Sequence, residues 1–132
     1  MSILNREQIL EVKDLKIELA PVSEYWGGDV YVRGLTGRGR DKFESSIVEI
    51  RGKKSRTDLT NIRAKLAAAT ICDEDGNLLF SEKDAGALGE KSAAALQIVF
   101  VVAQRLSGLS DQDVEELTEA LEANPLEDSA SD

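Results

Sequence analysis

The sequence predicts an α+β fold, with a small antiparallel sheet of two hairpins packed against about four helices. Apolar and polar residues alternate over 14–22, which is the period of a strand with one buried face. Apolar residues recur every three or four positions over 38–51 and 90–107, which is typical of helices. The Asp75-Gly76 pair between two apolar runs indicates a hairpin turn.

The first hairpin is expected over residues 15–35, after a short helix at 4–12. Its strands are separated by the turn signal Gly27-Gly28. Side chains at alternate positions of a strand point to the same face, so one set from each strand is predicted to be buried. The residues assigned to the buried faces are Leu15, Ile17, Leu19, Val30, Val32 and Leu35.

The helix predicted at 38–51 has Thr36 as its N-cap and Gly52 as its C-cap. The basic run at 51–56 is expected to be a solvated loop, with local binding of an anion as the alternative. A short helix is expected at 58–63.

The stretch 65–72 is ambiguous, because its alanines favour a helix and the turn that follows it favours a strand. A second hairpin that pairs residues 66–72 with 77–80 is the prediction. Asp73, Asp75 and Asn77 alternate like calcium ligands, but a calcium loop has glycine at its sixth position and here Gly76 is at the fourth. The turn is therefore the favoured interpretation. Ser81 is predicted to cap a short helix that follows the hairpin.

The helix at 90–107 is apolar on all sides, with Val99 and Phe100 on one face and Ile98, Val101 and Val102 on the other. Such a helix is either central in the core or partly buried against a partner. The core position is favoured for this helix, and an interface with a partner or a second copy is the alternative.

A last amphipathic helix is expected from Ser110, with Leu117 and Leu121 on its apolar face and glutamates on the other. Residues 1–123 are therefore predicted to form a single domain. Residues 124–132 are polar and acidic, and are expected to be a disordered tail.

The composition excludes several kinds of site. The chain has no histidine and only one cysteine, so neither an ordinary zinc site nor a Ser-His or Cys-His nucleophile pair can be built. No catalytic, metal or cofactor site is therefore predicted. The net charge is −9, divided into +3 over residues 1–72 and −12 over 73–132, which argues against nucleic acid as a partner. No apolar run is long enough to span a membrane.

Contacts with other protein chains are the remaining function class. Tyr25 and Trp26 stand side by side in the connection of the first hairpin, where they either cover the core or anchor a partner. The candidate contacts to a partner or to a second copy are Tyr25, Trp26, Ile98, Val101, Val102, Leu117 and Leu121.

Four segments together resemble the tail assembly chaperones of long-tailed bacteriophages and prophages. Residues 24–37 read EYWGGDVYVRGLTG, and 40–44 read RDKFE. Residues 73–80 read DEDGNLLF, and the segment 96–110 follows them. The order and spacing of these segments carry the resemblance, which covers about residues 15–122.

The resemblance implies a small protein without enzymatic activity. Members of the family coat the tape-measure protein before assembly, help bring tail-tube protein to it, and leave before the tail is finished. The partners implied are thus the tape-measure and tail-tube proteins, with a homo-oligomer as a further expectation. The implied location is the cytoplasm of the bacterial host, with the protein absent from the mature virion. A longer form made by a frameshift is common in the family.

Two other function classes stay open. The chain could be a small structural head–tail or tail component that stays in the virion. It could also be a carboxylate-based enzyme that uses Asp41, Glu44, Asp73 and Asp75, although nothing in the sequence pairs these groups.

Overall fold

The computed structural model describes residues 2–51, 54–57 and 61–109. It has an α+β fold, as predicted, with a three-stranded antiparallel sheet in the order β1-β2-β5 and a separate two-stranded hairpin. The elements in chain order are α1 (Arg6–Glu11), β1 (Ile17–Ala20), α2 (Ser23–Trp26), β2 (Val30–Arg33), α3 (Gly37–Ile47), β3 (Val48–Arg51), β4 (Lys54–Thr57), α4 (Ile62–Thr70), β5 (Ile71–Cys72), η1 (Glu82–Asp84), α5 (Ala85–Leu88) and α6 (Ala93–Leu106).

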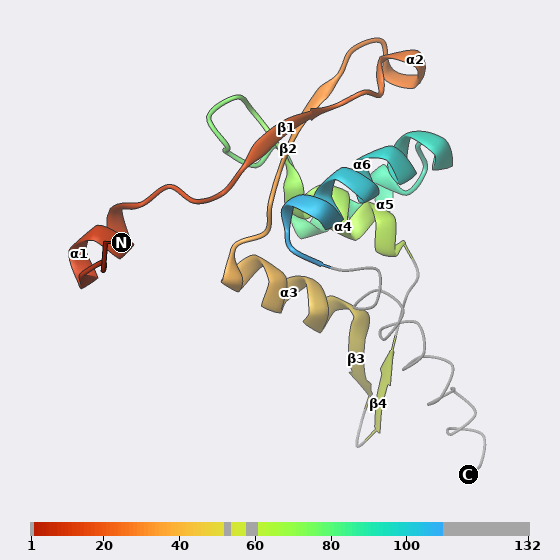
Figure 1. Cartoon of the computed structure of the whole chain (residues 1–132). Coiled ribbons are helices and arrows are strands. Elements are labelled where there is room, and N and C mark those ends of the chain that lie inside the picture. The colour runs from red at the N-terminus through yellow and green to blue at the C-terminus, as the bar shows by residue number, and fades with distance from the viewer. Residues whose placement is uncertain (1, 52–53, 58–60, 110–132) are drawn as a thin grey trace.

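The first predicted hairpin is confirmed. β1 and β2 pair antiparallel, with Leu19 opposite Tyr31 and Ala20 opposite Val30. The short helix α2 forms part of the connection and ends at Gly27, whose φ of 80° is in the left-handed region that glycine tolerates. The hairpin is twisted, and α6 packs against both of its strands (Figure 1).

The prediction for β1 fails at Leu19, although Leu15 and Ile17 of the same predicted face are half-buried. Ala20 is fully buried, whereas Leu19 is 53% exposed. Leu19 was assigned to the buried side, but it is its polar neighbour Glu18 that lies on the helix side and pairs with Arg105 of α6. The prediction for β2 was correct at Val32, which is fully buried.

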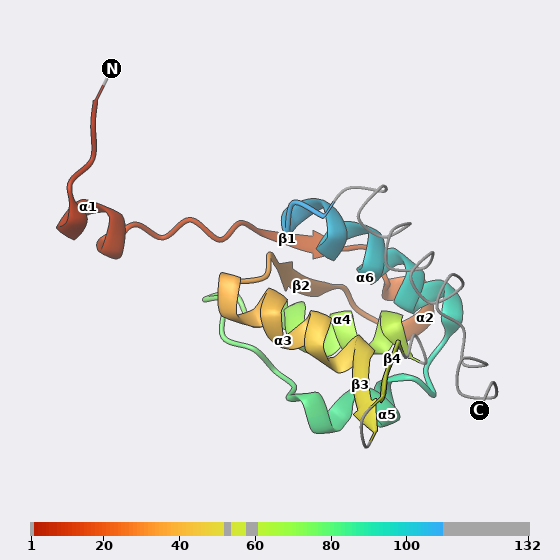
Figure 2. The same ribbon diagram turned by 90° about the horizontal axis from the view of Figure 1, so that it is seen from below.

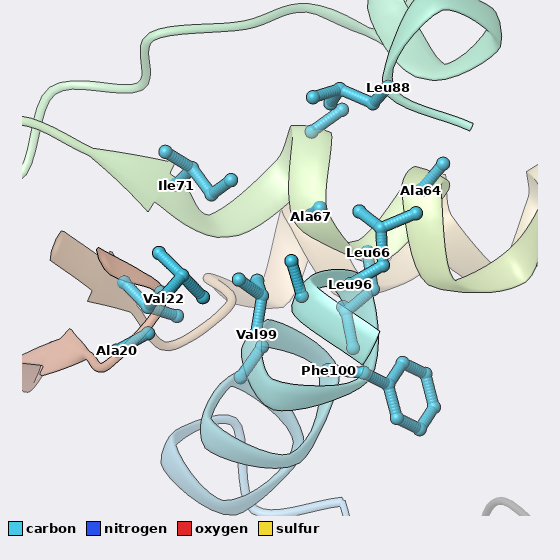
Figure 3. Packing of buried hydrophobic residues seen from close by; sticks show 14 of the residues in the cluster. Ala20, Val22, Ala64, Leu66, Ala67, Ile71, Leu88, Leu96, Val99 and Phe100 are labelled. Carbon is cyan, nitrogen blue, oxygen red and sulfur yellow. The ribbon is translucent and has the colours of Figure 1, made fainter. Parts of the chain in front are cut away.

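One face of the sheet is covered by helices. α4, α5 and α6 gather on the same side of the β1–β2 hairpin, and α6 contacts both strands as well as α4 (Figures 1 and 2). Leu96 and Val99 of α6 join Leu66 of α4, Ile71 of β5 and Val22 in one apolar cluster (Figure 3). Val99 and Phe100 are buried, as expected for a core helix.

The helix predicted at 38–51 ends early. α3 spans Gly37–Ile47, and the last four residues of the prediction form β3. Because β3 pairs with β4, the described residues of the basic run, Arg51 and 54–56, lie in paired strands and not in a loop. Thr36 caps α3 as predicted, since its Oγ1 accepts a hydrogen bond from the backbone N–H of Gly39 at 2.8 Å. The predicted cap at Gly52 lies outside the described residues.

The second predicted hairpin is wrong in most of its first strand. Ile62–Thr70 forms α4, which also replaces the short helix expected at 58–63 where that range is described. Only Ile71 and Cys72 are extended, and Cys72 pairs with Leu78 through an isolated bridge. The alanines around Leu66 favour the helix. Only the two residues of β5 are therefore extended before the chain reverses at the turn.

The N-terminus is an arm that projects from the body. α1 confirms the short helix predicted at 4–12, and an extended stretch joins it to β1 (Figures 1 and 2). At the other end, the predicted helix from Ser110 and the tail at 124–132 lie outside the described residues. Within the described part of the chain, no helix combines the length and the apolar character that crossing a membrane requires.

Candidate protein-binding site

A row of side chains crosses the face of the sheet that faces away from α6. Leu19 of β1 lies opposite Tyr31 of β2, Tyr31 lies opposite Cys72 of β5, and Cys72 is bridged to Leu78. Directly opposite residues of antiparallel strands point to the same face, so these four positions form one cross-strand set. We call it the apolar row.

The apolar row is exposed at three of its four positions. Leu19 is 53% exposed, Leu78 40% and Tyr31 36%. Cys72 is buried between them, and burial raises the pKa of its thiol above the ordinary range. Cys72 thus acts as a small apolar residue in the floor of the row, not as a reactive thiol.

Contacts on the opposite face hold the sheet in this orientation. The carboxylate of Glu18 accepts hydrogen bonds from both terminal nitrogens of Arg105, at 2.8 and 2.7 Å. This bidentate pair joins β1 to α6. The hydrogen bonds from Arg105 lower the pKa of Glu18, and Leu19, the next residue of β1, lies on the other face.

The turn before Leu78 is held by a single carboxylate. Asp73 accepts hydrogen bonds from the backbone N–H groups of Asp75 and Asn77, at 2.8 and 2.9 Å, and its pKa is lowered, mainly by the Asn77 bond. Gly76 has a φ of 89°, which suits glycine at this position. The predicted turn is confirmed, and it brings Leu78 back alongside Cys72.

A groove lies next to the apolar row, between α3, α4 and the segment 78–85. Its volume is about 410 Å³, within the usual range for binding pockets. We call it the α3–α4 groove, and Leu78 lies where it meets the apolar row. Its apolar lining is Phe43, Ala68, Ala69, Leu78, Phe80 and Ala85.

The charged lining of the α3–α4 groove is mostly basic. Arg33, Lys42 and Lys65 line it, against the single carboxylate of Glu82. Lys65 donates a hydrogen bond to the carbonyl oxygen of Ser46 at 2.9 Å, and Arg33 donates one to the carbonyl of Gly76 at 2.8 Å. Within the described part of the chain, neither Arg33 nor Lys42 forms an ion pair with a carboxylate. The groove therefore favours an anionic, partly apolar occupant.

The described candidate contacts predicted from the sequence belong to α2 and α6, and none of them is part of the apolar row or lines the groove. Tyr25 is 42% exposed, whereas the neighbouring Trp26 is partly buried against the core. On α6, Val101 is 51% exposed, and Ile98 and Val102 are half-buried against the core. Leu117 and Leu121 lie outside the described residues.

The four carboxylates considered for catalysis are not gathered in the groove. Glu44 pairs with Arg40 on α3 at 3.1 Å, and Asp73 holds the turn. None of the four is among the described residues that line the α3–α4 groove.

The sequence reasoning missed Leu19, Tyr31, Leu78 and the cations of the groove. One signal was available, because Tyr31 stands between Val30 and Val32 and must face away from the buried side of β2. An aromatic residue on that face marks it as more than a solvated surface. No family model, no curated protein and no solved structure matches this chain.

Proposed function

We propose that this protein is a tail assembly chaperone of a long-tailed phage or prophage. It binds an unassembled tape-measure protein, helps to recruit tail-tube protein, and leaves before the virion is complete. Its site of action is the host cytoplasm, and its partners are proteins, not nucleic acid or membrane. The proposal starts from the resemblance of residues 24–37 and 73–80 to that family, and the observation that supports it is the exposed apolar row.

A client helix fits the open face of the sheet for a simple reason. A sheet in an α+β domain is stabilised by helices, and here α6 packs on one face, while the turn at 73–77 covers the other face at Ile17 and Arg33. Four neighbouring strand positions span about 14 Å, since strands lie about 4.8 Å apart. This is close to the diameter of a helix with its side chains, about 10–12 Å. One apolar helix laid on Leu19, Tyr31 and Leu78 would cover the exposed side chains.

Release is compatible with this mode of binding. The exposed part of the apolar row is only three side chains, so each contact with the client is modest. Many copies along one long client would bind it tightly as a set and could still be displaced one at a time.

Co-expression with the tape-measure protein of the same genome tests the proposal. The wild-type protein is expected to keep the tape-measure protein soluble and to co-purify with it. Leu19→Asp is expected to abolish both effects, because it places a charge in the apolar row. Ala94→Asp is the matched control, since it adds the same charge at an exposed position of α6, on the helix side of the sheet.

A tape-measure protein that is equally soluble alone and fails to co-purify would contradict the proposal. Mass spectrometry of purified particles gives a second reading. Absence of the chain from the particles agrees with a chaperone, whereas its presence in stoichiometric amount would identify a structural component retained in the virion.

A further inference from the structure

The helix of the N-terminal arm is fixed by its own capping residues. The side chain of Asn5 accepts a hydrogen bond from the backbone N–H of Gln8 at 2.9 Å, and the side chain of Gln8 accepts one from the N–H of Asn5 at 3.0 Å. This reciprocal capping box determines where α1 begins. It does not supply the stability that a six-residue helix needs.

In the described part of the chain, α1 stands apart from the body of the protein (Figures 1 and 2). None of its residues is buried, and its large side chains Ile9 and Leu10 are 54% and 66% exposed. Val12, just after it, is 55% exposed. An isolated helix shorter than about 12–15 residues is marginal in water, so α1 requires a surface that covers these side chains.

The arm is directed away from its own body. The backbone N–H of Gly34 donates a hydrogen bond to the carbonyl of Lys16 at 3.2 Å, which extends the pairing of the two strands to that residue. From there the chain runs outward to α1 (Figures 1 and 2). The surface that covers the exposed side chains of α1 is therefore expected on another molecule.

The α3–α4 groove has the complementary character. Its apolar lining can cover Ile9 and Leu10, and its cations Arg33 and Lys42 have no carboxylate partner within the described residues. α1 carries Glu7 and Glu11 one turn apart. Arg6 pairs with Glu7 at 3.3 Å, which leaves Glu11 as the carboxylate of α1 available to a basic groove.

We propose that α1 of one copy occupies the α3–α4 groove of a second copy, so that two chains exchange their arms. The exchange is reciprocal, since each chain supplies one arm and one groove, and it closes as a two-fold dimer. This self-association goes beyond the proposed function, because it requires no client protein.

Two charge reversals test the exchange by sedimentation velocity on the full chain. Glu11→Lys places a cation against the basic groove, and Lys42→Glu places an anion against α1. Each variant alone is expected to weaken the dimer by about tenfold or more, through repulsion in both contacts. An equimolar mixture of the two variants is expected to dimerise as the wild type does, because both contacts of the mixed dimer join opposite charges.

Matched controls separate this effect from a change in total charge. Asp14→Lys reverses a charge just after α1, and Lys83→Glu reverses an exposed lysine that does not line the groove. Both are expected to dimerise normally. All four variants are expected to fold as the wild type does, which circular dichroism checks, since each substitutes an exposed side chain.

Three results would overturn the proposal. The first is a wild-type chain that stays monomeric at concentrations of about 100 μM, where a dimer with micromolar affinity is filled. The second is a mixture that behaves as the separate variants do, which would place each arm on its own body or elsewhere. The third is a dimer that is lost on removal of residues 110–132 and weakened by Lys42→Glu but not by Glu11→Lys, which would assign the groove to that acidic segment.

Discussion

Gly34 at the end of β2 lies directly against the backbone carbonyl of Leu106 at the end of α6. A Cβ atom at position 34 would be 2.6 Å from that carbonyl oxygen and 3.1 Å from its carbon. The residues that follow these two are also joined, because the backbone N–H of Leu35 donates a hydrogen bond to the hydroxyl of Ser107 at 3.0 Å. The sheet and its covering helix are therefore in contact through backbone, where only glycine fits.

Gly34→Ala is expected to destabilise the fold by about 1–3 kcal/mol or more, which is the usual cost of overpacking. The added methyl group meets backbone atoms that cannot move independently of α6. Chemical denaturation measures the loss. Gly37→Ala is the control, because a Cβ there has nothing within 4 Å and alanine suits the start of α3. Equal stabilities of the two variants would show that the close contact does not exist.

Val99→Asp is expected to prevent folding or to lower stability by several kcal/mol, because it buries a charge without a partner. Val99 is fully buried in the core cluster between α6, α4 and the sheet. Val101→Asp should retain the wild-type fold, since Val101 is 51% exposed on the same helix. Circular dichroism and the melting temperature of both variants check this, and a stable, fully helical Val99→Asp variant would contradict the assigned core.

The Glu18–Arg105 pair predicts a pH-dependent contribution to stability. Hydrogen bonds from Arg105 hold the pKa of Glu18 below its ordinary value of 4.5 in the folded state. A lowered pKa contributes stability above the unfolded value, and the contribution is lost as the pH falls through the folded value. The difference in unfolding free energy between wild type and Glu18→Gln should therefore be larger at pH 7 than at pH 3. A difference independent of pH would mean that the pair is not formed.

The thiol of Cys72 is expected to react slowly with a disulfide reagent at pH 8. Cys72 is 2% exposed, and burial raises the pKa of its thiol, so little thiolate is present and the reagent has no access. The rate should rise steeply when denaturant opens the sheet. A native rate equal to that of the unfolded chain would contradict the placement of Cys72 in the floor of the apolar row.

The fold class could be predicted from periodicity and turn chemistry, but several boundaries of helices and strands could not. The hairpin around Gly27 and the helix that contains Val99 were predictable because their patterns are long and their turn signals are local. The end of α3 was not, because Ile50 continues the helical spacing of Phe43 and Ile47 after the chain has entered β3. Tertiary pairing with β4 decides that boundary.

The candidate site depends on which face of β1 meets the helices, and the sequence alone does not decide this. Alternation states that Leu19 and Glu18 face opposite sides, but not which side meets the helices. The answer depends on distant residues, because Ala20 and Val32 are buried on the face of Glu18, where Arg105, 87 positions away, pairs with it. The groove also depends on residues that are far apart in the sequence. Lys42 of α3 and Phe80, which follows β5, line it together only once both segments have packed.

The central claim is that the open face of the sheet binds a client helix, and a direct binding measurement tests it best. Labelled helical segments that tile the tape-measure protein can be titrated with the purified chain and followed by fluorescence anisotropy. The account predicts that at least one segment binds and that Tyr31→Asp weakens it by at least about tenfold, while Ala94→Asp leaves it unchanged. Equal affinity of the wild type and Tyr31→Asp for every bound segment would contradict it.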